Sequence, residues 1–162
     1  FKLFEKAENI LAECGFDSGN NQNVFHLYRD LYTLWPDLKK LKEKVDAGAD
    51  YIVTQMFFDN SKFFEFLEKA KSAGINVPII PGIKPIAVKK HLQLLPQVFK
   101  IDLPEDLVNA VDSCKNNKEV RQVGIEWCIQ QCKELIDFGV PGLHFYTMSN
   151  SINTKRIAET VY

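Results

Sequence analysis

Hydrophobic and polar positions divide the chain beyond residue 36 into three short apolar runs separated by amphipathic segments. The first run, residues 51–58 (YIVTQMFF), is almost continuously apolar and too short for a buried helix. A run of this length is typical of a strand covered on both faces, as in a parallel sheet. Residues 77–80 (VPII) and 143–148 (LHFYTM) predict a second and a third strand.

The segments between these runs carry apolar residues at helical spacing. Pro36 and Asp37 open the first helix, because proline and an acidic residue are both favoured in a first turn. Its lysine-rich face is interpreted as solvated surface, with contact to a ligand phosphate as the alternative. Helices are expected over residues 37–45, 63–73, 86–95, 104–111, 118–138 and 152–161, and an earlier one over residues 2–14.

Strands that alternate with helices pair in parallel through right-handed crossovers. The order therefore fits an α/β fold, either an open doubly wound sheet or part of an eight-fold barrel. No glycine-rich GxGxxG turn follows any of the three predicted strands, which disfavours dinucleotide binding of the doubly wound type. A full barrel takes about 250 residues. If the fold is a barrel, the pattern predicts its second half.

Composition narrows the class of protein. The 162 residues suit one domain, and 20 basic against 21 acidic side chains predict neither nucleic-acid nor membrane-surface binding. No apolar run reaches the roughly 20 residues of a membrane span, and no signal peptide is recognised, so we expect a cytoplasmic protein. The cysteines, Cys14, Cys114, Cys128 and Cys132, lack paired metal spacing and are interpreted as reduced thiols without a metal.

Candidate functional residues follow the predicted strands, because function collects at the carboxyl ends of parallel strands. Gln55 is a carboxamide in a buried strand, and it fits equally a ligand contact or a core glutamine satisfied by backbone. Lys84 follows an expected Pro81-Gly82 turn, where an exposed loop lysine is favoured over a Schiff-base or phosphate lysine. Alternation places His144 and Tyr146 on one face, which favours a site lining over a buried network.

Four blocks of sequence add a resemblance to this pattern. KVDAGADYIVTQMFFDN, INVPIIPGIKPI, EVRQVGIEWCIQQCKEL and GVPGLHFYTM, in this order and spacing, resemble the C-terminal half of the methylenetetrahydrofolate reductase family, and bacterial members most closely. The resemblance runs from about residue 37 to the C-terminus. It implies a (β/α)8 TIM barrel, of which this chain covers about the C-terminal half. It also implies FAD, on which NADH or NADPH and a folate substrate take turns.

The resemblance implies roles for particular side chains. Gln55 matches a strand glutamine that contacts the folate pterin edge and the nicotinamide. Tyr146 and His144 would line the folate-side mouth, and His91 stands where some members have a substrate-contacting glutamine. The reaction implied is hydride transfer to FAD and then to the methylene carbon, which yields 5-methyltetrahydrofolate.

The cofactor contacts implied by the resemblance come before the first strand. Asp37 and Lys44 match an acid and a base used on the ribose and pyrophosphate side of FAD, and Lys40 matches a further FAD contact. Glu43 replaces a basic FAD neighbour, and Asn150 replaces a basic substrate contact seen in some members. The glutamate that serves the family as general acid is not found.

Three hypotheses follow. The first is a methylenetetrahydrofolate reductase represented by residues 36–162, with residues 1–35 an unplaced helical segment. The second is a non-catalytic truncated remnant or interaction module of the same fold. The third is an unrelated barrel lyase that uses Lys84 as a Schiff base. A half-barrel would expose two unpaired sheet edges, so we also expect association into a homo-oligomer.

Overall fold

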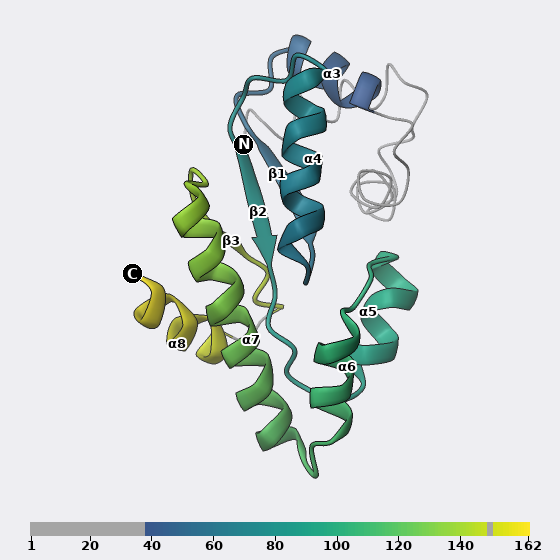
Figure 1. Ribbon diagram of the computed structural model, residues 1–162, viewed down its shortest axis with the longest axis vertical. Helices are drawn as coiled ribbons and strands as arrows, with labels where there is room; N and C mark the ends of the chain where they lie inside the picture. The colour runs from purple at the N-terminus through teal and green to yellow at the C-terminus, as the bar shows by residue number, and fades with distance from the viewer. Residues whose placement is uncertain (1–37, 149–150) are drawn as a thin grey trace.

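The computed structural model describes residues 38–148 and 151–162, which form a small parallel sheet with helices packed along it (Figure 1). The predictions about residues 1–35, Asp37 and Asn150 lie outside the described residues. The elements in chain order are α3 (Leu38–Asp46), β1 (Ile52–Met56), α4 (Asn60–Ser72), β2 (Ile79–Ile83), α5 (His91–Phe99), α6 (Glu105–Asp112), α7 (Asn117–Phe138), β3 (His144–Phe145) and α8 (Ile152–Val161).

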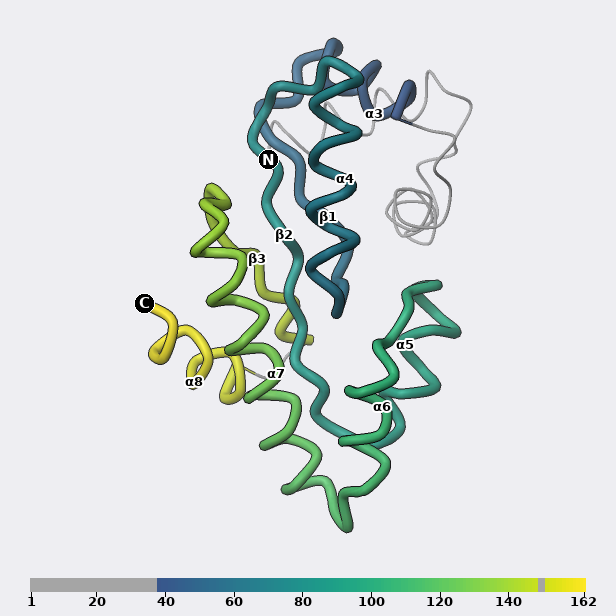
Figure 2. Tube along the Cα trace, viewed as in Figure 1, coloured from purple at the N-terminus to yellow at the C-terminus, as the bar shows by residue number. Residues whose placement is uncertain are grey.

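The sheet has the order β1-β2-β3, and both strand pairs are parallel. The predicted α/β class and parallel pairing are therefore confirmed. In Figures 1 and 2, α4 runs beside β1 and β2, and α7 runs beside β2 and β3. Helices α5 and α6 lie beyond the carboxyl end of β2, where its arrowhead points.

Local sequence chemistry sets several helix ends. Asp59 caps α4, because its carboxylate accepts a 2.9 Å hydrogen bond from the amide of Ser61. Asn116 caps α7 in the same way, and Gly139 ends α7 with a φ of 92°, a left-handed conformation that favours glycine. The predicted extents of α7 and α8 agree with the structure to within one residue.

Two predictions around β2 were wrong. Pro81 and Gly82 lie inside β2 and do not form a turn after it. The helix expected from residue 86 begins only at His91. In the segment before it, Ile86 is buried and its backbone lies directly against α7. A Cβ added to Gly124 of α7 would overlap the carbonyl oxygen of Ile86. The third strand was expected over residues 143–148, but β3 includes only His144–Phe145.

Two apolar clusters form the core. The first joins the sheet to α3, α4, α7 and α8, and its buried members include Leu41, Ile52, Phe63, Ile79, Ile83, Ile125, Cys128, Cys132, Leu135 and Ile157. The second fills the space at the carboxyl end of the sheet: Met56, Phe58, Ile86, Leu95, Ile101, Leu107, Val111 and Val120. Cys114, Cys128 and Cys132 are free thiols. A hydrogen bond with Cys132, together with burial, raises the pKa of the Cys128 thiol.

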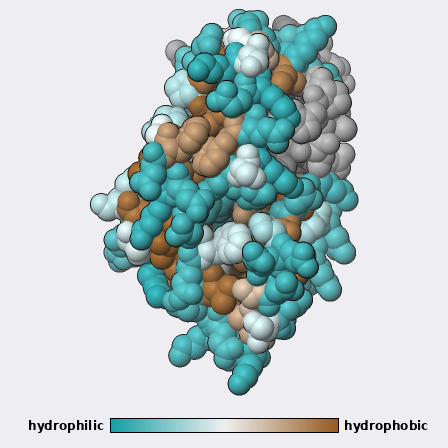
Figure 3. Space-filling model, in the orientation of Figure 1, coloured by the Kyte–Doolittle hydropathy of each residue, from teal (hydrophilic) through white to brown (hydrophobic). Residues whose placement is uncertain are grey.

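The surface in Figure 3 is mainly hydrophilic, with smaller apolar areas between the helices. Phe64 of α4 stacks on Phe138 of α7 with ring centroids 4.3 Å apart, which fastens these two helices together at the surface. Within the described residues, no helix combines the length and apolar character needed to cross a membrane.

Candidate functional site

Strand β1 carries an irregularity at its carboxyl end. Val53 pairs with Ile80, but Met56 pairs with Gly82. Two residues therefore lie between the paired positions on β1, whereas only one lies between them on β2. One extra residue is therefore inserted in β1, which is a β-bulge. Bulges are over-represented next to active sites, because they re-aim a side chain. Gln55 lies in this bulge.

Thr54 is held at the bulge by both neighbouring strands. The hydroxyl of Tyr146, just beyond β3, donates a 2.9 Å hydrogen bond to the carbonyl oxygen of Thr54. The amide of Gly82 in β2 donates to the Thr54 Oγ1 at 2.9 Å, and that hydroxyl donates to the carbonyl of Gln55 at 3.0 Å. Polar groups that the bulge removes from the ladder therefore find other partners, as buried backbone groups must.

Gly82 makes this arrangement sterically feasible. A Cβ at this position would overlap the carbonyl oxygen of Thr54 and lie 2.7 Å from Cε2 of Tyr146. The tyrosine ring therefore passes directly over the β2 backbone, and the Tyr146 amide also donates to the carbonyl of Ile83 at 2.8 Å. Only a residue without a side chain allows the ring to approach so closely.

Gln55 is 4% exposed, and the two ends of its carboxamide have different surroundings. The Oε1 atom accepts a 3.0 Å hydrogen bond from the amide of Met56. Within residues 38–148 and 151–162, the Nε2 group makes no hydrogen bond. The oxygen end thus agrees with the core-glutamine interpretation, whereas both N–H donors of the nitrogen end are unused among the described residues.

His144 and Tyr146 do lie on one face, as the alternation predicted. Their rings meet edge to face with centroids 4.6 Å apart. His144 is exposed and Tyr146 is half-buried. The tyrosine hydroxyl is engaged with Thr54, so Tyr146 belongs to a buried network, while the exposed histidine lies at its outer edge.

Lys84 is the first residue after β2, and the expectation of an exposed loop lysine was wrong. Its side chain is 6% exposed, and burial lowers the pKa of its ammonium group. His91, at the start of α5, is half-buried, and its Nδ1 accepts a 3.2 Å hydrogen bond from the amide of Ala87. Burial lowers the pKa of His91, and the positive charge of Lys84 lowers it further.

Two residues of α7 that the sequence analysis did not single out hold the chain after Gln55. Gln131 Nε2 donates to the carbonyl of Phe57 at 3.0 Å, and Trp127 Nε1 donates to the carbonyl of Phe58 at 3.2 Å. Asn60 in turn donates to the carbonyl of Gln131 at 3.1 Å. The available signal was a glutamine within the apolar stripe of α7, which requires a polar partner if buried.

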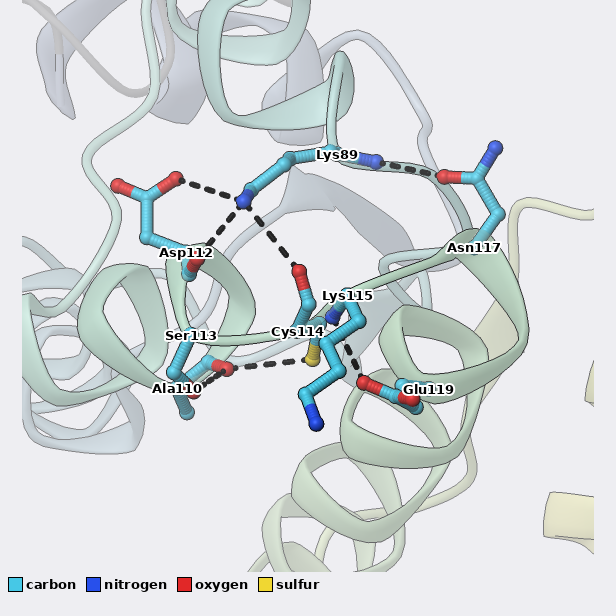
Figure 4. A network of polar contacts seen from close by, with 8 residues as sticks. All are labelled: Lys89, Ala110, Asp112, Ser113, Cys114, Lys115, Asn117 and Glu119. Carbon is cyan, nitrogen blue, oxygen red and sulfur yellow. Dashed lines mark hydrogen bonds and ion pairs between the residues drawn. The ribbon is translucent and has the colours of Figure 1, made fainter.

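The loop after β2 is held by Lys89, as Figure 4 shows. The Lys89 Nζ donates to the carbonyl oxygens of Asp112 and Cys114 at 2.7 and 3.4 Å, at the carboxyl end of α6. A cation is favourable there, because the last carbonyls of a helix lack partners within it. The Lys89 amide also donates to the side chain of Asn117 at 3.4 Å. These bonds anchor the loop that begins with Lys84.

The residues matched to cofactor contacts lie elsewhere. Lys40 is exposed and Lys44 is half-buried, and they are four residues apart on α3, so they share one face of this helix. Figure 1 shows α3 across the amino ends of β1 and β2, opposite to the end where β2 points. The structure therefore groups Gln55 and Tyr146 at one end of the sheet, and it does not bring the α3 lysines to them.

A parallel sheet with its polar groups at the carboxyl ends defines an α/β protein of the kind that binds ligands at that edge. Comparison with known proteins narrows this class. The family model for methylenetetrahydrofolate reductase matches residues 29–162. The chain belongs to the methylenetetrahydrofolate reductase family.

Named relatives include reductases from plants and bacteria. Methylenetetrahydrofolate reductase (NADH) 1 of Arabidopsis thaliana is 41% identical over 114 residues, which cover 70% of this chain and 19% of the relative. The 5,10-methylenetetrahydrofolate reductase of Escherichia coli is 35% identical over 126 residues, which cover 77% of this chain and 43% of the relative. The chain thus spans about a fifth of the plant relative and less than half of the bacterial one.

A solved structure shows likeness in fold alone. It is an uncharacterized protein from Clostridium thermocellum that binds two copies of 5-methyl-5,6,7,8-tetrahydrofolic acid. The match has a TM-score of 0.50 and 18% sequence identity, and it covers 76% of this chain and 46% of that protein.

Proposed function

We propose that this chain is part of an FAD-dependent methylenetetrahydrofolate reductase, which reduces 5,10-methylenetetrahydrofolate to 5-methyltetrahydrofolate with NADH or NADPH. The sheet would then belong to a (β/α)8 barrel, of which the chain covers about the C-terminal half. The observation that carries the proposal is the carboxamide of Gln55, held in a bulge at the carboxyl end of β1. A cytoplasmic location and association between copies are parts of the same proposal.

The names of the relatives support this reaction. They include reductases named for NADH, from Arabidopsis thaliana, and for NADPH, from Caenorhabditis elegans. The structural neighbour from Clostridium thermocellum binds a methylated tetrahydrofolate. Folate and nicotinamide both present amide-like groups, and one planar carboxamide can donate to either in turn.

The chain's own residues would prepare Gln55 for this role. Tyr146 and Gly82 hold Thr54, and the Met56 amide holds the Gln55 oxygen. The Nε2 donors therefore have a set direction before a ligand arrives, which lowers the entropic cost of orienting it. His144 and Tyr146 would line the mouth on the folate side.

FAD would be held by Asp37, Lys40 and Lys44. Two lysines on one face of α3 suit a diphosphate, because each ammonium acts as a point charge toward phosphate oxygens. Bound FAD would supply the hydride chemistry of the reaction. This assignment rests on the resemblance and on the chemistry of the donors.

The test of this proposal is a Gln55→Ala variant of the full chain, compared with Gln130→Ala on the exposed face of α7. Loss of one ligand hydrogen bond is worth about 1 kcal/mol, so turnover of both folate and nicotinamide substrates should fall about fivefold. The Gln130 variant should match the wild type. Undiminished turnover in Gln55→Ala would remove this residue from the site.

The separation of the α3 lysines from Gln55 favours a second candidate, a non-catalytic module of the same fold. Incubation with FAD followed by desalting separates the two candidates. Visible flavin absorbance retained by the wild type, and lost in a Lys40→Ala, Lys44→Ala double variant, supports the reductase. A colourless wild-type protein supports the non-catalytic module.

A further inference from the structure

The segment that leads from β1 to α4 is hydrogen-bonded to α7, which is distant from it in the sequence. The carbonyl oxygen of Phe57 accepts from Gln131 Nε2 at 3.0 Å. The carbonyl oxygen of Phe58 accepts from Trp127 Nε1 at 3.2 Å. Asn60, at the start of α4, donates to the carbonyl of Gln131 at 3.1 Å. These hydrogen bonds join the segment to residues that lie 69 to 74 positions further along the chain.

Packing fixes the two donors of α7. Gln131 is 5% exposed, and the Trp127 ring packs against the second apolar cluster. The two residues are four positions apart, so they share one face of the helix. The residues whose carbonyls they hold are buried in different clusters, Phe57 in the first and Phe58 in the second. A backbone that is anchored through both its carbonyls and its side chains has little freedom to rotate.

This anchor lies one residue beyond the group that holds Gln55. The Met56 amide donates to Gln55 Oε1 at 3.0 Å, and Phe57 is the next residue of the chain. The direction of the Met56 amide depends on the backbone that follows it, which Gln131 holds at the Phe57 carbonyl. Loss of this donor would let the Phe57 peptide turn and would move the Met56 amide relative to Oε1. The orientation of the Gln55 carboxamide is therefore coupled to α7 through the main chain.

We propose that Gln131 is a positioning residue for the Gln55 carboxamide, and that Trp127 is the second anchor. Gln131 acts through the backbone of Phe57 and Met56 and keeps the Nε2 donors of Gln55 in one direction. The inference rests on the proposed function in one respect, because this direction matters for turnover only if Gln55 contacts the folate and the nicotinamide. The coupling of Gln131 to Gln55 stands on the hydrogen bonds alone.

The first arm of the test is NMR of the side-chain amides of the full chain, in which Gln55→Ala identifies the Gln55 signals by their loss. Gln131→Met keeps a side chain of similar length and removes the donor. We expect the Gln55 signals to shift in this variant. Gln130→Met, at the exposed preceding glutamine, should leave them in place. Ile75→Val, in the core before β2, should also leave them in place.

Two results of this arm overturn the proposal. One is that the Gln55 signals do not shift in Gln131→Met. The other is an equal shift in Ile75→Val, because that variant lowers stability by loss of core volume and leaves the α7 donors intact. If Gln131→Met fails to fold, Trp127→Phe removes the second donor and retains a ring, and the same shift is expected.

The second arm is a double-mutant cycle on turnover of methylenetetrahydrofolate by the full chain with FAD and NADH. Gln131→Met should lower turnover by up to about fivefold, the loss expected for Gln55→Ala. In the Gln55→Ala background it should cause no further loss, because the group that it positions is absent. An equal loss in both backgrounds means that Gln131 acts through stability, and it overturns the positioning role. Absence of turnover in the wild type counts against the proposed reductase, and the NMR arm then decides the coupling of Gln131 to Gln55.

Discussion

The phenol oxygen of Tyr146 donates a 2.9 Å hydrogen bond to the carbonyl oxygen of Thr54, which precedes it by 92 residues. The bond spans the sheet, because β2 lies between the two strands concerned. The Gly82 amide donates to the Thr54 side chain, so the Thr54 carbonyl takes its hydrogen bond from the tyrosine. The short third strand thus helps to hold the strand that carries Gln55.

Tyr146→Phe tests this bond. The change removes one oxygen atom and leaves the Thr54 carbonyl without its side-chain donor. An unsatisfied buried acceptor costs about 1–3 kcal/mol, so we expect the free energy of unfolding in urea to fall by roughly that amount. Tyr162→Phe, at a tyrosine that is 79% exposed, is the control and should leave stability unchanged. Equal stability of the two variants would contradict the role given to the hydroxyl.

Gly82→Ala tests the close approach of the tyrosine ring. The added methyl would overlap the Thr54 carbonyl oxygen, so the strand or the ring must move. Overpacking of this kind costs about 1–3 kcal/mol or more. At Gly142 an added methyl meets no atom within 4 Å, and Gly142→Ala should therefore be nearly neutral. Thermal unfolding of both variants checks the prediction, and similar melting temperatures would refute it.

Gln131→Leu tests the support from α7. The substitution leaves the Phe57 carbonyl without the 3.0 Å hydrogen bond from Nε2. We expect a loss of about 1–3 kcal/mol in the free energy of unfolding. Gln130→Leu is the matched control, since Gln130 is the preceding residue of α7, is exposed, and donates to Glu134 on the same helix. The prediction fails if both variants unfold at the same urea concentration.

His91 should make stability depend on pH. Burial, and then the charge of Lys84, lower the pKa of His91 below its usual 6.5. The unfolded chain then binds more protons than the folded chain just below that pH, so stability falls as the pH drops through this interval. His91→Gln should remove the part of this acid-induced loss of stability that comes from protonation of His91. His144→Gln, at an exposed ring, should keep it, and urea unfolding between neutral and mildly acidic pH compares the two.

Lys84 should make stability depend on pH in the alkaline range. Burial lowers the pKa of Lys84 from 10.5, so its protonated form is disfavoured in the folded chain. Stability should rise with pH across the interval just below 10.5, where the folded chain has lost the proton and the unfolded chain retains it. Lys84→Met removes a buried charge that has no ion-pair partner among residues 38–148 and 151–162, so this variant should be more stable than the wild type at neutral pH and show a smaller alkaline rise. A less stable Lys84→Met would indicate a counter-ion for this lysine.

Local patterns were enough for much of the architecture. The apolar run around Ile52 identified a covered strand, and the alternation of strands and helices identified parallel pairing. Gly139 marked the end of α7, and the period of two placed His144 and Tyr146 on one face. Each of these depends on residues within a few positions of one another, where backbone geometry alone sets the outcome.

The sequence by itself thus determined the class of fold, the order of its elements and the carboxamide at Gln55. Only the tertiary structure decided the bulge that contains Gln55, the position of Pro81 and Gly82 inside β2, and the burial of Lys84. These features arise between segments distant along the chain. Strand register, steric overlap and desolvation depend on which segment packs against a given residue. A local sequence pattern does not identify that segment.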